Sequence, residues 1–174
     1  MNKACFIDLQ GTLGGNEFGD VRTFSFFSFS KEALERISSK DYLIFIITNQ
    51  SRIGAGYYSL DEYEELIEKI HLEVPSVERI LCCPHTRYDN CKCKKPKRGM
   101  IDQILVEYDI DLAESYVIGD MGKSDMNLAK EIGSKSVLVL TGAGKSSLEE
   151  YKHTWSEIEP TITADNILEA VNKL

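Results

Sequence analysis

The sequence predicts an α/β fold in which a doubly wound parallel sheet is covered by helices on both faces. Short apolar runs of strand length alternate along the chain with segments of helical period. A chain of 174 residues with 43% hydrophobic residues is long enough to bury a full core and has the usual size of one domain. We therefore expect residues 1–174 to form a single domain.

Five strands are expected, because five runs are rich in the apolar and β-branched residues that are typical of strands buried in a parallel sheet. In chain order the runs are ACFI (Ala4–Ile7), YLIFIIT (Tyr42–Thr48), RILC (Arg79–Cys82), SYVI (Ser115–Ile118) and SVLVL (Ser136–Leu140).

Helices are expected between these runs and after the last one, where apolar residues recur with helical period. Ser59 and Glu62 have the spacing of a capping box, so we expect a helix to begin there. The expected helices are Ser30–Ser38, Ser59–Val74, Gly99–Tyr108, Ser124–Ile132 and Asp165–Lys173.

The charge and the N-terminal sequence argue against several classes of protein. The net charge is −8, and the one notable basic stretch is KCKKPKR at 92–98, so we expect neither nucleic-acid nor membrane binding. The N-terminus lacks a signal-peptide pattern, and no segment has the roughly 20 apolar residues needed to span a bilayer. We expect a cytoplasmic protein that is a monomer or a small homo-oligomer.

Polar residues follow the first two expected strands, where the carboxyl ends of parallel strands bind ligands. The first strand leads directly to Asp8, and Gly11 then permits a sharp turn. A carboxylate at that place can serve as a nucleophile, as a metal ligand or as both. The second strand leads to Thr48 and the residues up to Ser51, whose hydrogen-bonding side chains suit phosphate oxygens.

The later strands add carboxylates and positive charge. Asp120 follows the fourth strand and Asp125 lies in the first turn of the next helix, a pair suited to Mg²⁺. Lys94 and Lys95 fall after the third strand and can offset the repulsion between these carboxylates and a phosphate. A single such residue is more often a turn former or a helix cap. The ordered set is the stronger signal, and the segment 142–146 is interpreted as a loop that closes the site.

This ordered set resembles the four motifs of the haloacid dehalogenase (HAD) superfamily over essentially the whole chain. It resembles most the subfamily of the heptose bisphosphate and histidinol-phosphate phosphatases, which carry TNQS (here Thr48–Ser51) and a cysteine–histidine loop. The resemblance implies a sheet without a large cap and a Mg²⁺-dependent phosphatase of small sugar or amino-alcohol phosphates. Asp8 would form an aspartyl-phosphate, while Thr48 and Lys95 would hold the phosphoryl group.

The resemblance also implies ligands for the metal and for the substrate. Mg²⁺ would be bound by Asp8, the Gln10 backbone carbonyl and Asp120, with Asp125 either a ligand or a neighbour of the ligands. A small phosphorylated metabolite is the expected partner. Its remaining groups would be contacted by Asn49, Gln50, Ser51, Arg52 and Lys94, with Arg87 as a further candidate.

Gln10 is the main departure from the family pattern DxDGT, whose second Asp is the general acid and base. A primary amide cannot exchange a proton near neutral pH, so a contribution of ~10²–10⁴-fold would be missing unless another group supplies it. Three alternatives follow: a phosphatase of activated esters, a phosphotransferase, and a catalytically impaired phosphate-binding or regulatory protein. A smaller departure is the spacing of five residues from Asp120 to Asp125, where close relatives commonly have four.

Four potential metal ligands cluster between the third strand and its helix. Cys83, His85, Cys91 and Cys93 offer three thiolates and one imidazole, the closed tetrahedral set of a structural Zn²⁺. The alternative is that some of these cysteines are buried free thiols. We interpret the neighbouring Cys82 as such a thiol. A zinc-stapled loop at about 82–94 would fix the two lysines that follow the last ligand.

Overall fold

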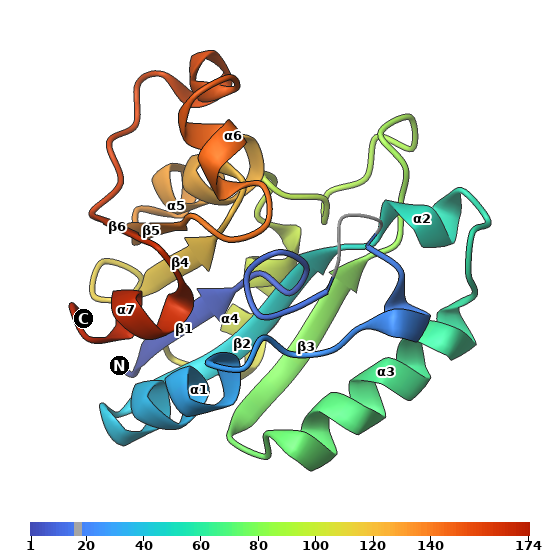
Figure 1. Ribbon diagram of the computed structural model, residues 1–174, viewed down its shortest axis with the longest axis horizontal. Helices are drawn as coiled ribbons and strands as arrows, with labels where there is room; N and C mark the ends of the chain where they lie inside the picture. Colours follow the sequence, from blue (N-terminus) through green and yellow to red (C-terminus); the bar gives the residue numbers. More distant parts are fainter. Residues whose placement is uncertain (16–18) are drawn as a thin grey trace.

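The computed structural model describes residues 1–15 and 19–174, and a six-stranded parallel sheet forms its centre (Figure 1). The strand order is β3-β2-β1-β4-β5-β6, so the chain winds outward from β1 in both directions. Ligands of such sheets bind beyond the carboxyl ends of the strands where the winding direction changes, here β1 and β4. The strands are β1 (Lys3–Ile7), β2 (Tyr42–Asn49), β3 (Val77–Cys83), β4 (Tyr116–Gly119), β5 (Lys135–Val139) and β6 (Ile162–Ala164).

Helices cover both faces of the sheet, and the side chains of each strand alternate between them. Cys5 and Ile7 of β1 pack with residues of α1, α3 and α7, whereas Ala4 and Phe6 pack with residues of α4 and α5. The helices that cover the sheet are α1 (Ser30–Ser39), α3 (Leu60–Glu73), α4 (Gly99–Glu107), α5 (Asn127–Ile132) and α7 (Ile167–Val171). The other helical elements are η1 (Val21–Thr23), α2 (Ser51–Gly54), η2 (Gly122–Met126), α6 (Gly144–Leu148) and η3 (Lys152–Trp155).

The predicted fold class and the five expected strands are confirmed, with differences at some element ends and at the edge of the sheet. The sixth strand, β6, was not expected, because its three residues are too few to show a pattern; it pairs with Val137–Val139 at the edge of the sheet. Helix α5 begins at Asn127 rather than at Ser124, because the preceding turn is a π-helix. No helix in the described ranges is long and apolar enough to cross a membrane.

The predicted capping box forms at the start of α3. Ser59 Oγ accepts a hydrogen bond from Glu62 N at 3.1 Å, and the Glu62 carboxylate accepts one from Ser59 N at 2.8 Å. These bonds satisfy two backbone donors that a helix start otherwise leaves unpaired. The cap therefore fixes the backbone directly after Tyr58, a residue whose side chain reaches the candidate site.

Candidate active site

A buried lysine joins two carboxylates at the carboxyl ends of the central strands. Asp8 follows β1, and Lys95 Nζ lies 2.6 Å from Asp8 Oδ1 and 2.7 Å from Asp125 Oδ1. The three residues are between 1% and 8% exposed. Burial alone would lower the pKa of Lys95, but Asp125 and Asp8 raise it above its ordinary value. Lys95 is therefore a charged group at the position predicted for a phosphoryl-binding lysine.

Asp120 reaches the same site from the end of β4 and lies between two glycines. Ala143 N donates a hydrogen bond to Asp120 Oδ2 at 2.7 Å. A Cβ on Gly11 or on Gly142 would lie 2.2 Å from the same oxygen, and both glycines have positive φ, 86° and 52°. Only glycine permits this backbone conformation and this close approach together. Gly142 and Ala143 thus lie against Asp120, whereas Gly144–Ser146, which the sequence indicated as part of a loop, begin helix α6 (Gly144–Leu148).

Asp125 reaches the site although it lies five residues after Asp120, one more than the resemblance to the family led us to expect. Gly122–Met126 form a π-helix, in which Asn127 N–H bonds to Gly122 O five residues earlier. A π-turn accommodates one extra residue without ending the helix. Asp125 Oδ1 accepts from Lys95, and its Oδ2 accepts from Met121 N at 3.1 Å. Both carboxylate oxygens of Asp125 are therefore engaged by protein donors.

The carboxylates outnumber the positive charge at this site. Side-chain oxygens of Asp8, Asp120 and Asp125 lie within 4.8 Å of one another, and Lys95 is the ammonium that contacts two of them. The pKa of Asp8 is raised to about 6, mainly by burial. The charge of Lys95 lowers this pKa, and the charge of Asp125 raises it. Burial, followed by the charges of Asp8 and Asp125, raises the pKa of Asp120 well above its usual range. Clustered carboxylate oxygens that favour a further positive charge fit a hard divalent cation such as Mg²⁺.

Asn49, predicted to bind substrate, hydrogen-bonds to the backbone of Lys95 through both polar atoms of its side chain. Its Oδ1 accepts from Lys95 N at 2.9 Å, and its Nδ2 donates to Lys95 O at 3.2 Å. Lys95 Nζ also donates to Ile47 O at 2.9 Å. The end of β2 thereby holds both the backbone and the side chain of the lysine.

The other residues of the second motif fall into two groups. Gln50 is 2% exposed and hydrogen-bonds to Thr48 and Tyr58, whereas the half-buried Ser51 accepts a hydrogen bond from Lys94 Nζ. Arg52 is also half-buried, and its guanidinium lies 5.4 Å from the centre of the Tyr57 ring. The roles predicted for these residues in substrate binding stay predictions. Tyr58 has no signal in the sequence that marks it as part of a site.

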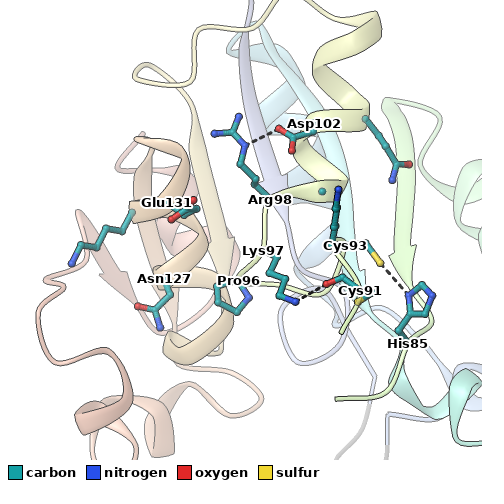
Figure 2. Close-up of a pocket in the computed structure, with 13 residues that line it drawn as sticks. His85, Cys91, Cys93, Pro96, Lys97, Arg98, Asp102, Asn127 and Glu131 are labelled. Carbon is teal, nitrogen blue, oxygen red and sulfur yellow. Dashed lines mark hydrogen bonds and ion pairs between the residues drawn. The ribbon is translucent and has the colours of Figure 1, made fainter. Parts of the chain in front are cut away.

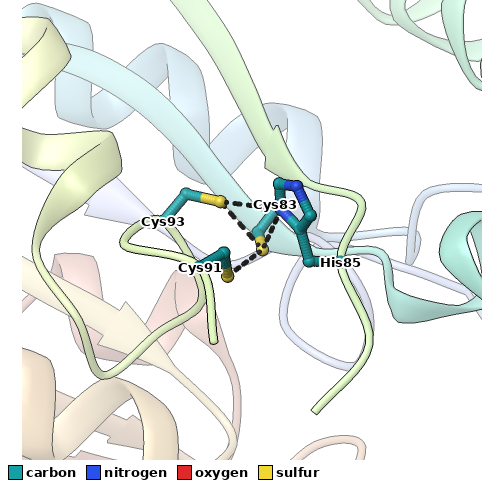
Figure 3. A group of neighbouring side chains, drawn as sticks. All are labelled: Cys83, His85, Cys91 and Cys93. Atoms are coloured by element: carbon teal, nitrogen blue, oxygen red, sulfur yellow. Dashed lines mark hydrogen bonds between the residues drawn. The ribbon is translucent and has the colours of Figure 1, made fainter. Parts of the chain in front are cut away.

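The four predicted zinc ligands converge from the two ends of their loop, as Figure 3 shows. Cys83 Sγ lies 3.5 Å from Cys91 Sγ and 3.0 Å from Cys93 Sγ, and His85 Nδ1 lies 3.2 Å from Cys93 Sγ. None of the five cysteines forms a disulfide. Three thiols and one imidazole at such distances fit a tetrahedral metal site with no open position.

The cysteine loop, residues 82–94, is hydrogen-bonded to the second motif. Gln50 N donates to Cys83 O at 2.8 Å, and Gly54 N donates to Pro84 O at 2.9 Å. Only Lys94 separates Cys93, the last of the four predicted ligands, from Lys95. The geometry of the loop therefore affects two parts of the active site, the short helix α2 that follows β2 and the buried lysine.

A cavity of about 1060 Å³ is lined by the cysteine loop, by residues 96–98 that follow it, and by α4 and α5 (Figure 2). Its lining includes Pro96 but none of the site carboxylates. Three of its cations are already engaged: Lys97 with Cys91 O at 2.6 Å, Arg98 with Asp102 at 2.7 Å and Lys130 with Glu157 at 2.9 Å. The cavity therefore offers little free charge to a ligand.

Comparisons with known proteins agree with this geometry. Residues 92–170 match the HAD-hydrolase-like family model. A D-glycero-beta-D-manno-heptose-1,7-bisphosphate 7-phosphatase from Neisseria meningitidis serogroup A is 35% identical over 132 residues, 74% of this chain and 70% of that protein. The enzyme of the same name from Pasteurella multocida is 34% identical over 164 residues, 87% of this chain and 88% of that protein.

A solved structure resembles the whole chain. It is the D,D-heptose 1,7-bisphosphate phosphatase from B. bronchiseptica complexed with magnesium and phosphate, with a TM-score of 0.85 and 25% identity over 99% of this chain and 97% of that one. The fold and these relatives define a phosphatase of the HAD type. The chain belongs to the heptose bisphosphate phosphatase family of the HAD superfamily.

Proposed function

We propose that the chain is a Mg²⁺-dependent phosphatase that removes a phosphoryl group from a small phosphorylated sugar through an aspartyl-phosphate on Asp8. The observation that carries the proposal is the Asp8–Lys95–Asp125 arrangement, with distances of 2.6 and 2.7 Å, where the winding of the sheet changes direction. Phosphoryl transfer depends mainly on positioning and on neutralising charge. This arrangement positions the nucleophile and the lysine, and a divalent cation at the clustered carboxylates would supply the further positive charge.

The residues divide the proposed reaction into two displacements. An oxygen of Asp8 bonds to phosphorus while the ester oxygen leaves with the bonding electrons and takes up a proton. Water then attacks the aspartyl-phosphate, which releases orthophosphate and restores the carboxylate. Lys95 and the Thr48 hydroxyl hold the equatorial oxygens through both steps. Bound Mg²⁺ would neutralise charge on the transferred phosphoryl group.

Asp8, Asp120 and the Gln10 backbone carbonyl are the proposed Mg²⁺ ligands. Asp125 is better placed as a neighbour of the metal, because its two oxygens accept from Lys95 and from Met121 N. It would keep Lys95 oriented toward the phosphoryl group. Arg52, Ser51 and Lys94 are the proposed contacts of the rest of the substrate.

The proposed substrate is a heptose 1,7-bisphosphate or a similar phosphorylated sugar, with an amino-alcohol phosphate as the alternative. The relatives named above carry the heptose substrate in their names. A second candidate function, phosphate binding or phosphotransfer without efficient hydrolysis, is favoured by one observation, the amide of Gln10 in place of a general acid.

Release of orthophosphate from a panel of phosphorylated sugars and amino alcohols is the test of this function. We expect turnover of at least one sugar phosphate with Mg²⁺, loss of turnover with EDTA and recovery when Mg²⁺ is restored in excess. The metal dependence follows from the three clustered carboxylates, which repel a phosphate dianion without a cation. A protein that binds phosphate with Mg²⁺ but releases none from any substrate would support the second candidate.

We also propose that Cys83, His85, Cys91 and Cys93 bind a structural Zn²⁺. Replacing Cys93 by serine is then expected to remove the zinc and to lower the melting temperature by about 10 °C, because structural zinc contributes directly to folding. Zinc content by elemental analysis and thermal unfolding are the measurements. Cys82→Ser is the matched control and should keep one zinc per chain. A Cys93→Ser variant with full zinc content and unchanged melting would contradict the proposal.

A further inference from the structure

A chain of buried hydrogen bonds runs from Tyr58 to the second motif. Tyr58 Oη donates to Gln50 Oε1 at 2.5 Å, and Gln50 Nε2 donates to Thr48 Oγ1 at 3.0 Å. The three residues are 5%, 2% and 1% exposed. Nothing in the proposed reaction uses Tyr58, yet its hydroxyl is connected through Gln50 to Thr48, the residue proposed to touch the phosphoryl group.

The orientation of the Gln50 amide decides which of two hydroxyl protons, that of Tyr58 or that of Thr48, has Gln50 Oε1 as its acceptor. In the described residues the Tyr58 hydroxyl donates to Gln50, and a buried hydroxyl without an acceptor is costly. If the Gln50 amide were turned over, its Nε2 would face Tyr58 and the phenol proton would lose that acceptor. The orientation with Oε1 toward Tyr58 therefore pairs the buried phenol proton and leaves the Thr48 proton without an acceptor among these three residues. Nε2 must then face Thr48.

This orientation decides what the Thr48 hydroxyl can do. A hydroxyl has one proton to donate and can accept through its lone pairs. Because Gln50 Nε2 donates to Thr48 Oγ1, the Thr48 proton cannot be donated back along the same contact. It is left free for another acceptor.

The active site supplies that acceptor when substrate is present. The carbonyl of Ile47, the residue before Thr48, accepts from Lys95 Nζ at 2.9 Å, and the same Nζ lies 2.6 Å from Asp8 Oδ1. Thr48 is thus adjacent in the chain to a group that contacts the phosphoryl-binding lysine. A phosphoryl oxygen has no proton and accepts strongly.

We propose that Tyr58 and Gln50 are positioning residues that hold the Thr48 hydroxyl as a donor to the phosphoryl group. The proposal rests on the proposed function of Thr48 and assigns to Gln50 an indirect role in place of a direct contact with substrate. It also gives a function to Tyr58, whose hydroxyl is hydrogen-bonded to Gln50.

Tyr58→Phe is the first variant that tests this role. Without the phenol proton both orientations of the Gln50 amide become accessible, and in one of them Thr48 donates to Gln50 Oε1 instead of to the phosphoryl oxygen. We expect kcat/KM to fall about tenfold, the usual size of one lost hydrogen bond in a buried polar site. Tyr63→Phe is the matched control. Tyr63 is also 5% exposed, lies outside the hydrogen-bond chain and should keep kcat/KM within about twofold.

A double-mutant cycle with Thr48→Val separates positioning from a general structural effect. If Tyr58 acts through the Thr48 hydroxyl, Tyr58→Phe should cost about tenfold in the wild-type background and less than about twofold in the Thr48→Val background. Equal losses in both backgrounds would overturn the proposal, because Tyr58 would then act on something other than Thr48.

Binding of inorganic phosphate in the presence of Mg²⁺, measured by calorimetry, gives a readout that does not need turnover. We expect Tyr58→Phe to weaken phosphate binding with the same dependence on Thr48, while Mg²⁺ affinity stays unchanged. If the wild-type protein hydrolyses nothing but shows this coupling, the proposed hydrolysis fails and the positioning role stands. If it hydrolyses sugar phosphates and the coupling is absent in both measurements, the positioning role fails alone. Unchanged phosphate binding in Tyr58→Phe overturns it in either case.

Discussion

Asp8→Asn is expected to reduce orthophosphate release by at least ~10⁴-fold, the scale of loss seen when a catalytic nucleophile is removed. The amide keeps the shape of the side chain, but it is too weak a nucleophile to form the phosphorylated intermediate. Steady-state release of orthophosphate measures the loss. Acid quenching of the wild-type reaction, followed by peptide mass analysis, should locate the phosphoryl group on the peptide that contains Asp8.

The same substitution should not destabilise the protein. Asp8, Asp120 and Asp125 are buried together, and Lys95 keeps its 2.7 Å contact with Asp125 when Asp8 loses its charge. One fewer buried carboxylate lowers the mutual repulsion in the metal-free state, so we expect an unchanged or higher melting temperature. This result would separate the loss of activity from unfolding.

Lys95→Met is the contrasting variant for that measurement. It leaves the carboxylates of the site without their buried ammonium, and removal of one partner from a buried ion pair typically costs about 3–5 kcal/mol. Activity should fall in both variants, but the melting temperature should fall only in Lys95→Met. Turnover by Asp8→Asn near the wild-type rate would contradict the assignment of Asp8 as the nucleophile. A lower melting temperature of Asp8→Asn would contradict the expected relief of repulsion between the buried carboxylates.

The residues that form the centre of the site could be predicted because a parallel sheet fixes where strand ends go. Asp8 and Asp120 each follow a buried apolar run, and β1 pairs directly with β4, so their side chains had to emerge at the same edge. Lys95 was predictable from the order of the motifs rather than from a local pattern. The cluster of Cys83, His85, Cys91 and Cys93 could be predicted on a different ground, because the residue types and their spacing carry the signal by themselves.

The roles of individual polar side chains could not be predicted in the same way. An Asn and a Gln beside a phosphate site suit direct substrate contact, and the sequence does not show that Asn49 is engaged by the backbone of Lys95, 46 residues away. The contact between Tyr58 and Gln50 likewise depends on how the loop after β2 folds back. Such choices are made by tertiary packing, which places competing partners within reach of the same amide.

The spacing of Asp125 shows the opposite situation, in which the sequence raised a question that backbone geometry answers. Asp125 lies five residues after Asp120. In a regular α-helix, one residue more than the expected four would rotate its side chain by about 100° away from the site. The π-helix at Gly122–Met126 absorbs the extra residue. Trp155 supports this turn, because its ring lies where a Cβ on Gly122 would be, at 2.1 Å, and its Nε1 donates to Ser147 O at 3.0 Å.

Gln10→Asp is expected to raise kcat for sugar phosphates by ~10²–10⁴-fold, the usual contribution of a general acid and base. In the described residues neither polar atom of the Gln10 amide has a hydrogen-bond partner, although both atoms are buried. The amide oxygen lies where a Cβ on Gly15 would be, at 1.8 Å. The side chain is therefore held in place without being used by its protein neighbours, and a carboxyl group there would be free to protonate a leaving oxygen.

The leaving group decides how large this effect is. A sugar alkoxide is a strong base and needs a proton as it leaves, whereas p-nitrophenolate is stable without one. Gln10→Asp should therefore accelerate hydrolysis of a sugar phosphate far more than hydrolysis of p-nitrophenyl phosphate, and the ratio of the two rates is the quantity to measure. Gln10→Asn is the matched control, with the length of aspartate but no acid, and should leave that ratio unchanged.

The two rates together show which group, if any, protonates the leaving oxygen in the wild-type protein. A large gain confined to the sugar phosphate means that the site is complete except for the acid, and that the wild-type protein is suited to activated esters or to holding the phosphoryl group. A wild-type rate on sugar phosphates that Gln10→Asp does not improve means that another group already delivers the proton. In that case the inability of the amide to exchange a proton is no obstacle to hydrolysis. The binding and phosphotransfer alternatives then lose the observation that favours them.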